Sequence, residues 1–302
     1  RTSSSGITEA NARLLALPGI DSAIANVVSL ARTVLATANV SEGQSMHFVN
    51  YEKRGRISII TLNRPERLNA VGAQMRADLV EAWTTFIEDR DAWVAILTGT
   101  GRAFCAGRDL KDEAELRREG KRPDGRLPEI FNYYHMPTTE KPIIGAANGG
   151  AWGYGWFMLC GSDIVVASDQ AVFAMAELPT GGIGPSFVPL LNNIPWIPGS
   201  EIVLRGHTIT AQRAYELGFL GHVVPADQVM TRALEIAEEM AALPPLHVQA
   251  TKAMLMMARP RASGYQLEVG YPKASGGLRN LQDSKEGSLA FAEKRKPVFV
   301  GR

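Results

Sequence analysis

The sequence has 302 residues, of which 45% are hydrophobic and 21% are charged, and its 32 Lys and Arg residues against 31 Asp and Glu residues leave a formal charge of +1 at pH 7. This composition is that of an ordinary globular protein, long enough to bury one substantial core. It excludes a chain that binds nucleic acid or an anionic membrane through its overall charge, so any anion-binding site has to be local.

Residues 1–45 differ from the rest of the chain. They begin with the polar stretch RTSSSG, and apolar residues then recur at helical spacing from Ile20 to Leu35. Asp21 and Arg32 interrupt that apolar stretch, which argues against a secretory signal peptide. We expect residues 1–45 to be an N-terminal extension, either one amphipathic helix or a segment of engineered origin, outside the domain that begins at Met46.

From Met46 onward, short apolar strands alternate with helices. Strands are predicted at residues 56–65, 92–101, 142–150, 162–168 and 171–177. Residues 73–91 are predicted to form an amphipathic helix that carries Met75, Leu79, Ala82, Trp83 and Phe86 on one face. Further helices are predicted at residues 200–219, 227–243, 245–260 and 283–297. The order strand, helix, strand predicts an α/β domain, followed here by a helical C-terminal region.

The cysteines and histidines indicate neither a disulfide framework nor a metal site. Cys105 and Cys160 both lie in apolar surroundings, which favours reduced, buried thiols and a cytoplasmic protein. The histidines are scattered, with no pair at i, i+3 or i, i+4, so we expect no metal site. Residues 142–162 carry no charge, but their glycines favour a buried strand and a turn over a membrane-spanning helix.

Two of the predicted strands end in glycine-bearing turns, at residues 97–110 (LTGTGRAFCAGRDL) and 147–156 (ANGGAWGYGW). Glycine lets a backbone approach a ligand closely, so two such turns can direct two backbone amides at one oxygen. The alternative is that both turns are only tight connections between elements. Neither turn contains a dinucleotide fingerprint, and the chain has no P-loop and no G-x-S-x-G elbow, which argues against nicotinamide, nucleoside triphosphate and serine hydrolase chemistry.

Six stretches, in this order, resemble the successive motifs of the crotonase superfamily, the enoyl-CoA hydratases and isomerases. They are ITLNRPERLNAV, GRAFCAGRDL, KPIIGAANGGAWGYG, SDIVVASDQAVFAMAELPTGGI, AYELGFLGHVVP and EGSLAFAEKRKPVF. The resemblance implies a crotonase-type spiral of ββα units over residues 46–245. It also implies a helical region over residues 246–302 that builds a homotrimer or hexamer and closes the CoA site. The implied substrate is an acyl-CoA thioester, with no separate cofactor because coenzyme A is part of the substrate.

The resemblance also implies how the chemistry works. In the family, two backbone amides polarise the thioester carbonyl, so that the substrate can carry negative charge as an enolate. Those amides correspond here to Arg108, which follows CAG, and to Tyr154, the middle residue of GYG. Tyr154 departs from the family pattern, which has a glycine or another small residue at that position.

The acid and base are the least typical part of the pattern. Hydratases of the family use two glutamates; the second corresponds to Glu177, whereas Phe157 stands at the position of the first. A single glutamate is the pattern of some Δ3,Δ2-enoyl-CoA isomerases and of hydroxycinnamoyl-CoA hydratase-lyases. The implied activity is therefore that of a lyase or isomerase with Glu177 as its acid and base. Thioester hydrolysis, C–C cleavage and a catalytically idle acyl-CoA binder or scaffold remain alternatives, as does a purely structural Glu177.

Further substrate contacts are implied in the same turns and near the C-terminus. They are Arg67, Leu68, Arg102, Ala106, Asp109, Trp152, Gly153, Phe157, Phe291 and Lys294. The arginines and Lys294 correspond to positions near the phosphates and adenine of CoA, although each could equally be a solvated surface charge. The rings between Trp152 and Phe157 are expected to wall an apolar acyl pocket, with core packing of Trp156 and Phe157 as the alternative.

Overall fold

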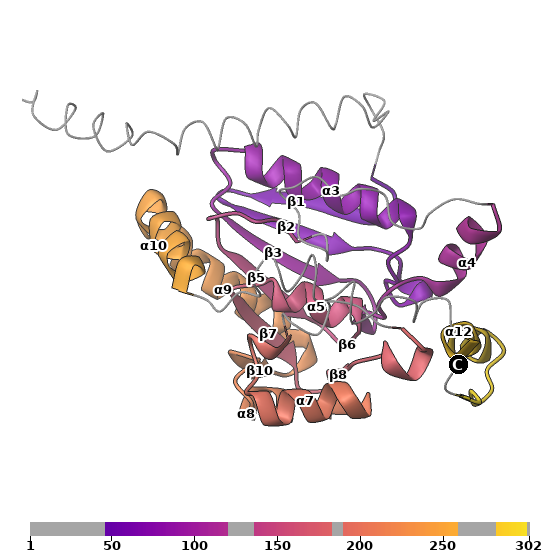
Figure 1. The fold of residues 1–302 in the computed structure, drawn as a ribbon. Coiled ribbons are helices and arrows are strands. Elements are labelled where there is room, and N and C mark those ends of the chain that lie inside the picture. The colour runs from indigo at the N-terminus through magenta and orange to yellow at the C-terminus, as the bar shows by residue number, and fades with distance from the viewer. Residues whose placement is uncertain (1–45, 120–135, 183–189, 259–281, 301–302) are drawn as a thin grey trace, which may run out of the picture.

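The computed structural model describes residues 46–119, 136–182, 190–258 and 282–300, and the predicted extension at residues 1–45 lies outside this part. The strands form a six-stranded sheet, in the order β1-β2-β3-β5-β7-β10, and a four-stranded sheet, in the order β4-β6-β8-β9 (Figure 1). Their bounds are β1 Val49–Arg54, β2 Ile57–Leu62, β3 Val94–Gly99, β4 Ala103–Cys105, β5 Ile143–Ala147, β6 Gly150–Trp152, β7 Ile164–Ser168, β8 Val172–Ala174, β9 Thr208–Thr210 and β10 His222–Val224. The predicted α/β class is confirmed.

Helices connect and cover these strands. The α-helices of the described residues are α3 Ala73–Glu88, α4 Leu110–Arg118, α5 Tyr154–Cys160, α7 Trp196–Arg205, α8 Ala211–Glu216, α9 Val229–Ala241, α10 Pro245–Ala258 and α12 Gln282–Ala292. The short 3-10 helices are η1 Pro65–Arg67, η2 Leu178–Thr180 and η3 Ala226–Gln228.

The six-stranded sheet is buried on both faces because α3 and α9 cover opposite sides of it. In β3, Val94 and Ile96 belong to the core that contains α9, whereas Ala95 and Leu97 belong to the core that contains α3. This alternation explains why the parallel strands read as continuous apolar runs. The predicted apolar face of α3 is confirmed, because all five of its predicted core residues are fully buried.

The helix predicted at residues 200–219 is wrong as a single element. Helix α7 ends at Arg205, and Gly206 follows with a φ of 59° in the left-handed conformation that commonly ends helices. The β-branched residues of Thr208–Thr210 then form β9, which pairs antiparallel with β8. The side chain of Thr210 accepts a hydrogen bond from the Arg213 amide and begins α8.

The uncharged residues 142–162 form β5, β6 and α5 rather than one long helix. Within the described part of the chain, no helix is both long and apolar enough to cross a membrane. Cys105 and Cys160 are buried free thiols, as predicted, and burial raises the pKa of the Cys105 thiol to about 12.

The four-stranded sheet gathers the candidate site residues at one edge. Strands β4, β6 and β8 are parallel neighbours, with Cys105 paired to Ala151 and Trp152 paired to Ala174. The carboxyl ends of parallel neighbouring strands meet at the same edge of a sheet. Arg108, Tyr154 and Glu177 each follow one of these strands within three residues, so the fold brings together three segments that are far apart in the sequence.

Candidate active site

The first glycine turn, after β4, is fixed by backbone hydrogen bonds on both sides of Arg108. The Val71 amide donates to the Gly107 carbonyl at 2.8 Å, and the Asp109 amide donates to the Val71 carbonyl at 3.1 Å. Gly107 has a φ of 94°, a conformation that favours glycine. The peptide of Arg108 therefore sits in a backbone frame held by residues on either side of it.

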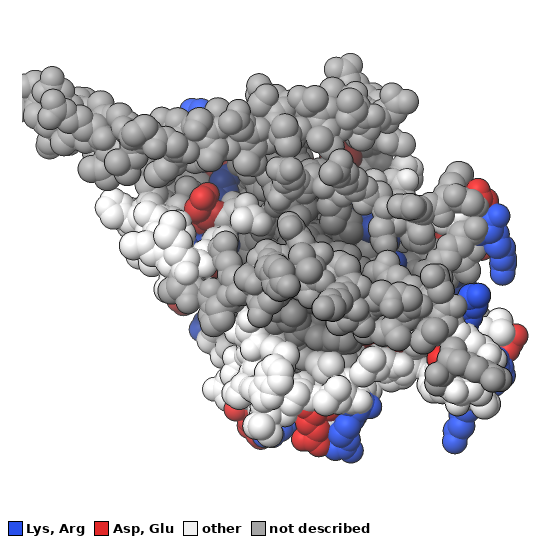
Figure 2. All heavy atoms as spheres, viewed as in Figure 1, with Lys and Arg blue, Asp and Glu red and all other residues white. Residues whose placement is uncertain are grey.

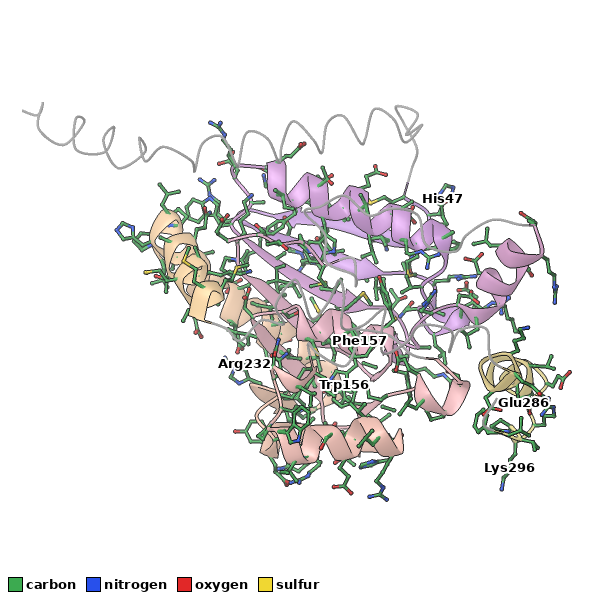
Figure 3. All side chains as sticks on the ribbon, viewed as in Figure 1. His47, Trp156, Phe157, Arg232, Glu286 and Lys296 are labelled. Atoms are coloured by element: carbon green, nitrogen blue, oxygen red, sulfur yellow. The ribbon has the colours of Figure 1, made fainter. Side chains whose placement is uncertain are left out.

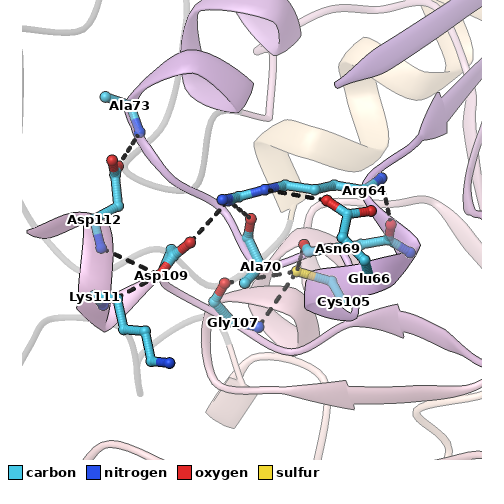
Figure 4. A network of polar contacts seen from close by, with 10 residues as sticks. All are labelled: Arg64, Glu66, Asn69, Ala70, Ala73, Cys105, Gly107, Asp109, Lys111 and Asp112. Atoms are coloured by element: carbon cyan, nitrogen blue, oxygen red, sulfur yellow. Dashed lines mark hydrogen bonds and ion pairs between the residues drawn. The ribbon is translucent and has the colours of Figure 1, made fainter. Parts of the chain in front are cut away.

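Asp109 and Arg64 brace this turn (Figure 4). Asp109 is buried, and its Oδ2 accepts a hydrogen bond from Arg64 Nη1 at 2.8 Å. Its Oδ1 accepts hydrogen bonds from the amides of Lys111 and Asp112, in the first turn of α4. Both oxygens of Asp109 are thus engaged by the protein, which favours a structural role; the predicted substrate contact of Asp109 stays a prediction.

Asn69 ties the preceding loop to the same turn. Its Nδ2 donates to the carbonyls of Thr100, Ala103 and Phe104 at 2.9–3.1 Å, and its Oδ1 accepts from the Arg64 amide at 2.9 Å. The side chain is fully buried, and its φ of 56° is a left-handed value that Asn tolerates. The sequence prediction missed both Arg64 and Asn69 as site residues.

We expect Asn69→Ala to lower the free energy of unfolding by about 3 kcal/mol, because it leaves buried carbonyls without their donor. Asn50→Ala is the control, since Asn50 is an exposed Asn whose Oδ1 accepts a long hydrogen bond from Asn63, at 3.5 Å. Urea unfolding of both variants measures the difference. A loss below about 1 kcal/mol for Asn69→Ala would show that the network does not hold this turn.

The second glycine turn packs directly on the first. Gly153 has a φ of 46° and precedes Tyr154, the first residue of α5. A Cβ atom placed on Gly107 would lie 2.9 Å from the Trp152 carbonyl oxygen and 3.6 Å from the Tyr154 amide nitrogen. The structure therefore brings the two turns together, backbone against backbone, as an oxyanion hole requires.

Glu177 points at the second turn. It immediately precedes η2, and a Cβ atom placed on Gly153 would lie 2.6 Å from its Oε1. Its Oε2 is buried and has no hydrogen-bond partner among the described residues. Burial raises the pKa of Glu177 to about 7, against the opposing effects of the Glu177 and Ala176 amides and of the Arg108 charge. Near neutral pH such a carboxyl can both remove and return a proton.

This raised pKa makes stability depend on pH in a defined direction. Between its usual pKa of 4.5 and its folded pKa of about 7, the folded chain keeps a proton that the unfolded chain loses, so the free energy of unfolding falls as pH rises. Glu177→Gln removes this effect. We expect the variant to gain up to about 3 kcal/mol over the natural chain between pH 4.5 and 8, measured by urea unfolding. A difference that does not change with pH would contradict the raised pKa.

The aromatic residues of α5 lie inside the molecule (Figure 3). Trp156 is fully buried, with ring centroids 5.6 Å from those of Phe173 and Phe219, so core packing describes it better than a pocket wall. Phe157 is 1% exposed and belongs to the same core, and its contact with substrate stays a prediction. Trp152 is half-buried, and its ring lies over Gly150.

The residues predicted to contact CoA fall into two groups. The loop with Arg67 and Leu68 lies beside the first turn, because the Ala106 amide donates to the Leu68 carbonyl at 2.9 Å. Arg67 and Arg102 are exposed, so both are accessible to a solvent-borne anion. Lys294 is exposed just after α12, whereas the side chain of Phe291 lies outside the described part.

Across the described ranges, no group of three or more His, Cys, Asp or Glu side chains could hold a metal ion.

Comparisons with known proteins show the family of this chain. The enoyl-CoA hydratase/isomerase family matches residues 52–302. Enoyl-CoA hydratase EchA19 of Mycobacterium tuberculosis is 36% identical over 265 residues, which cover 83% of this chain and 96% of that protein. Carnitinyl-CoA dehydratase of Proteus mirabilis is 34% identical over 277 residues, covering 86% of this chain and 99% of that protein.

The fold is likewise similar to solved structures. The crystal structure of carnitinyl-CoA hydratase from Mycobacterium avium has a TM-score of 0.76 and 32% sequence identity, and the match covers 86% of this chain and all of that one. The predicted crotonase fold is confirmed. This chain belongs to the enoyl-CoA hydratase/isomerase family of the crotonase superfamily and is an acyl-CoA-processing enzyme.

Proposed function

We propose that this enzyme moves a proton within the acyl group of an acyl-CoA thioester, with Glu177 as its only acid and base. The observation that carries the proposal is the position of Glu177, a buried carboxyl of pKa about 7 directed at the second glycine turn. The proposed reaction is the isomerisation of a 3-enoyl-CoA to a 2-enoyl-CoA. Phe157, where a hydratase of the family has its other glutamate, supports a reaction that needs no second carboxylate.

The steps follow from one carboxyl and two amides. Glu177 as a carboxylate removes a proton from carbon 2, and the electrons of that C–H bond delocalise onto the thioester oxygen as a dienolate. The amides of Arg108 and Tyr154 donate hydrogen bonds to that oxygen. Protonated Glu177 then returns the proton to carbon 4, which leaves the double bond between carbons 2 and 3. No atom is gained or lost, so no water and no cofactor besides the CoA of the substrate take part.

Addition or elimination of water is the second candidate. The names of the relatives favour it, because one is a hydratase and the other a dehydratase. With one carboxyl, Glu177 would both take the proton from carbon 2 and pass it to the departing hydroxyl group. Thioester hydrolysis, C–C cleavage and binding without catalysis are the remaining alternatives.

The test is to give the purified protein 3-hexenoyl-CoA and crotonyl-CoA in separate assays and to follow the enoyl-thioester absorbance. We expect isomerisation of 3-hexenoyl-CoA to have the larger kcat/KM. Faster hydration of crotonyl-CoA would replace the proposal with the second candidate. Binding of both compounds without turnover would indicate an idle acyl-CoA binder.

Phe157→Glu restores a carboxyl at the position where hydratases of the family have one. We expect it to raise the ratio of crotonyl-CoA hydration to 3-enoyl-CoA isomerisation, because two carboxylates can hold a water between them. Phe157→Gln is the control, since it places a polar group of similar size without an acid or base. Because Phe157 is only 1% exposed, the variant must first be shown to fold. An unchanged ratio in the folded variant would contradict the idea that Phe157 is what prevents hydration.

Self-association as a trimer or hexamer is part of the proposal. Exposed large apolar side chains are most numerous on α7, with Trp196, Ile197 and Leu204, and on α10, with Leu246, Met254, Leu255 and Met257. The surface over α10 is largely uncharged in the view of Figure 2. Apolar faces of this kind mark interaction sites. Sedimentation that shows a stable monomer would contradict this self-association. The predicted cytoplasmic location of the protein stays a prediction.

A further inference from the structure

Helix α12 packs on the segment that carries Glu177. Along this helix Gly287 and Ala290 are buried, whereas Lys285 and Leu289 are exposed. Residues three apart lie on the same side of a helix, so α12 turns a face of small residues toward η2. Figure 1 shows α12 at the edge of the molecule, separate from the helices that cover the six-stranded sheet.

Gly287 allows the two backbones to touch. A Cβ atom placed on Gly287 would lie 2.4 Å from the carbonyl carbon and oxygen of Thr180 and 2.6 Å from the Gly181 amide nitrogen. Side chains do not approach backbone atoms so closely, so any larger residue here has to displace one segment. Glycine weakens a helix interior relative to alanine, which makes close packing the physical reason for a glycine at this position.

The peptide that Gly287 touches, between Thr180 and Gly181, lies between two amides that donate hydrogen bonds to the carbonyl of Glu177. The carbonyl of Glu177 accepts hydrogen bonds from the amides of Thr180 and Gly182, at 3.1 and 2.7 Å. The Thr180 hydroxyl lies 2.8 Å from the Ala176 carbonyl oxygen and 3.0 Å from that of Glu177, so its one proton is shared between these two acceptors. A shift of Thr180 or Gly181 is therefore transmitted directly to the backbone of Glu177.

The residues after α12 fold back onto the helix. Glu286 accepts hydrogen bonds from Arg295 Nη2 and the Val298 amide, each at 2.8 Å, and Asp283 accepts from the Val300 amide at 2.7 Å. Figure 3 places Glu286 on α12. Beside the Gly287 contact, a pocket of about 300 Å³ is lined by Met175, Pro179, Arg295 and Pro297. Because α12 lies at the edge of the molecule, it can shift outward when Gly287 is enlarged, and we expect such a variant to fold.

We propose that Gly287 is a positioning residue for Glu177: the docking of α12 on Thr180 and Gly181 fixes the backbone of the glutamate and thereby holds its carboxyl in the buried position. This role rests on the proposed function, in which Glu177 moves the proton. It goes beyond the predicted closure of the CoA site, because it acts through the backbone of η2 rather than through a contact with substrate.

The test compares Gly287→Val with Lys285→Val, which places the same side chain on the exposed face of the same helix. We expect Gly287→Val to lower the kcat for 3-hexenoyl-CoA isomerisation at least tenfold with little change in KM. The apparent pKa of its kcat profile should move from near neutral toward the usual carboxyl range, because a shifted backbone no longer holds the Glu177 carboxyl in its buried position. Hydrogen exchange of the Thr180 and Gly182 amides should be at least tenfold faster. Lys285→Val should behave as the natural chain does.

Gly287→Ala provides a second variant if the valine prevents folding, since even this Cβ would meet Thr180. A natural pH profile and natural exchange rates in the folded variants would overturn the positioning role. That failure differs from failure of the proposed function. If only the positioning role fails, the natural chain is active and Glu177→Gln is not. If the proposed function fails, Glu177→Gln keeps its activity. The exchange rates do not depend on activity and report on the docking in both cases.

Discussion

Glu177→Gln is expected to lower the kcat for 3-enoyl-CoA isomerisation by at least three orders of magnitude. The amide has nearly the same shape as the carboxyl but cannot carry a proton between carbons 2 and 4, and general acid–base groups contribute about 10²- to 10⁴-fold each. The affinity for CoA should stay the same, because a proton carrier acts on the transition state and contributes little to nucleotide binding. Steady-state kinetics and calorimetric titration with CoA measure the two effects.

Glu201→Gln is the matched control. Glu201 lies on the exposed surface of α7, where it pairs with Arg205, so its loss should leave kcat unchanged. A Glu177→Gln variant with more than a tenth of the natural kcat would show that Glu177 is a structural carboxyl. The single-base mechanism would then be wrong, although membership of the family would stand.

Local patterns predicted the elements with long, regular apolar periodicity. The face of α3 could be predicted because Met75, Leu79 and Phe86 repeat at helical spacing, and tertiary packing did not alter it. Three-residue strands such as β4, β6 and β9 are too short to show a period of two. These strands form because neighbouring strands supply their hydrogen bonds, which local sequence does not show. For this reason the sequence pattern predicts a helix at Thr208–Thr210, where the structure has β9.

The candidate site likewise has features that the sequence predicts and features that only the structure shows. The resemblance to the family identified Glu177 and the two glycine turns, but the pKa of Glu177 depends on burial that no spacing encodes. Asn69 and Arg64 were missed because their partners, such as Phe104 and Asp109, are 35 and 45 residues away in the chain. A sequence signal did exist, since NRPERLNA belongs to the quoted motif. That these two residues hold the first glycine turn in place can be seen only from their contacts in the structure.

Gly107→Ala is expected to lower kcat about 10²- to 10³-fold, the usual effect of losing one oxyanion-hole donor. The new Cβ would lie 2.9 Å from the Trp152 carbonyl oxygen, so the two turns have to move apart and the Arg108 and Tyr154 amides no longer converge on one oxygen. The φ of 94° adds backbone strain of about 1–3 kcal/mol to the folded state.

Gly218→Ala separates these two effects. Gly218 has a similar φ of 80°, but a Cβ atom placed there meets nothing within 4 Å, and the residue lies on the exposed side of the turn after α8. Both variants should lose stability in urea unfolding from the backbone strain, Gly107→Ala by more because its Cβ also meets the Trp152 carbonyl, and only Gly107→Ala should lose kcat. Binding of 4-dimethylaminocinnamoyl-CoA gives a second measure, because polarisation of its thioester carbonyl shifts the absorbance to longer wavelength. We expect that shift in Gly218→Ala and not in Gly107→Ala. Equal kcat values for the two variants would mean that the contact between the turns does not build the oxyanion hole.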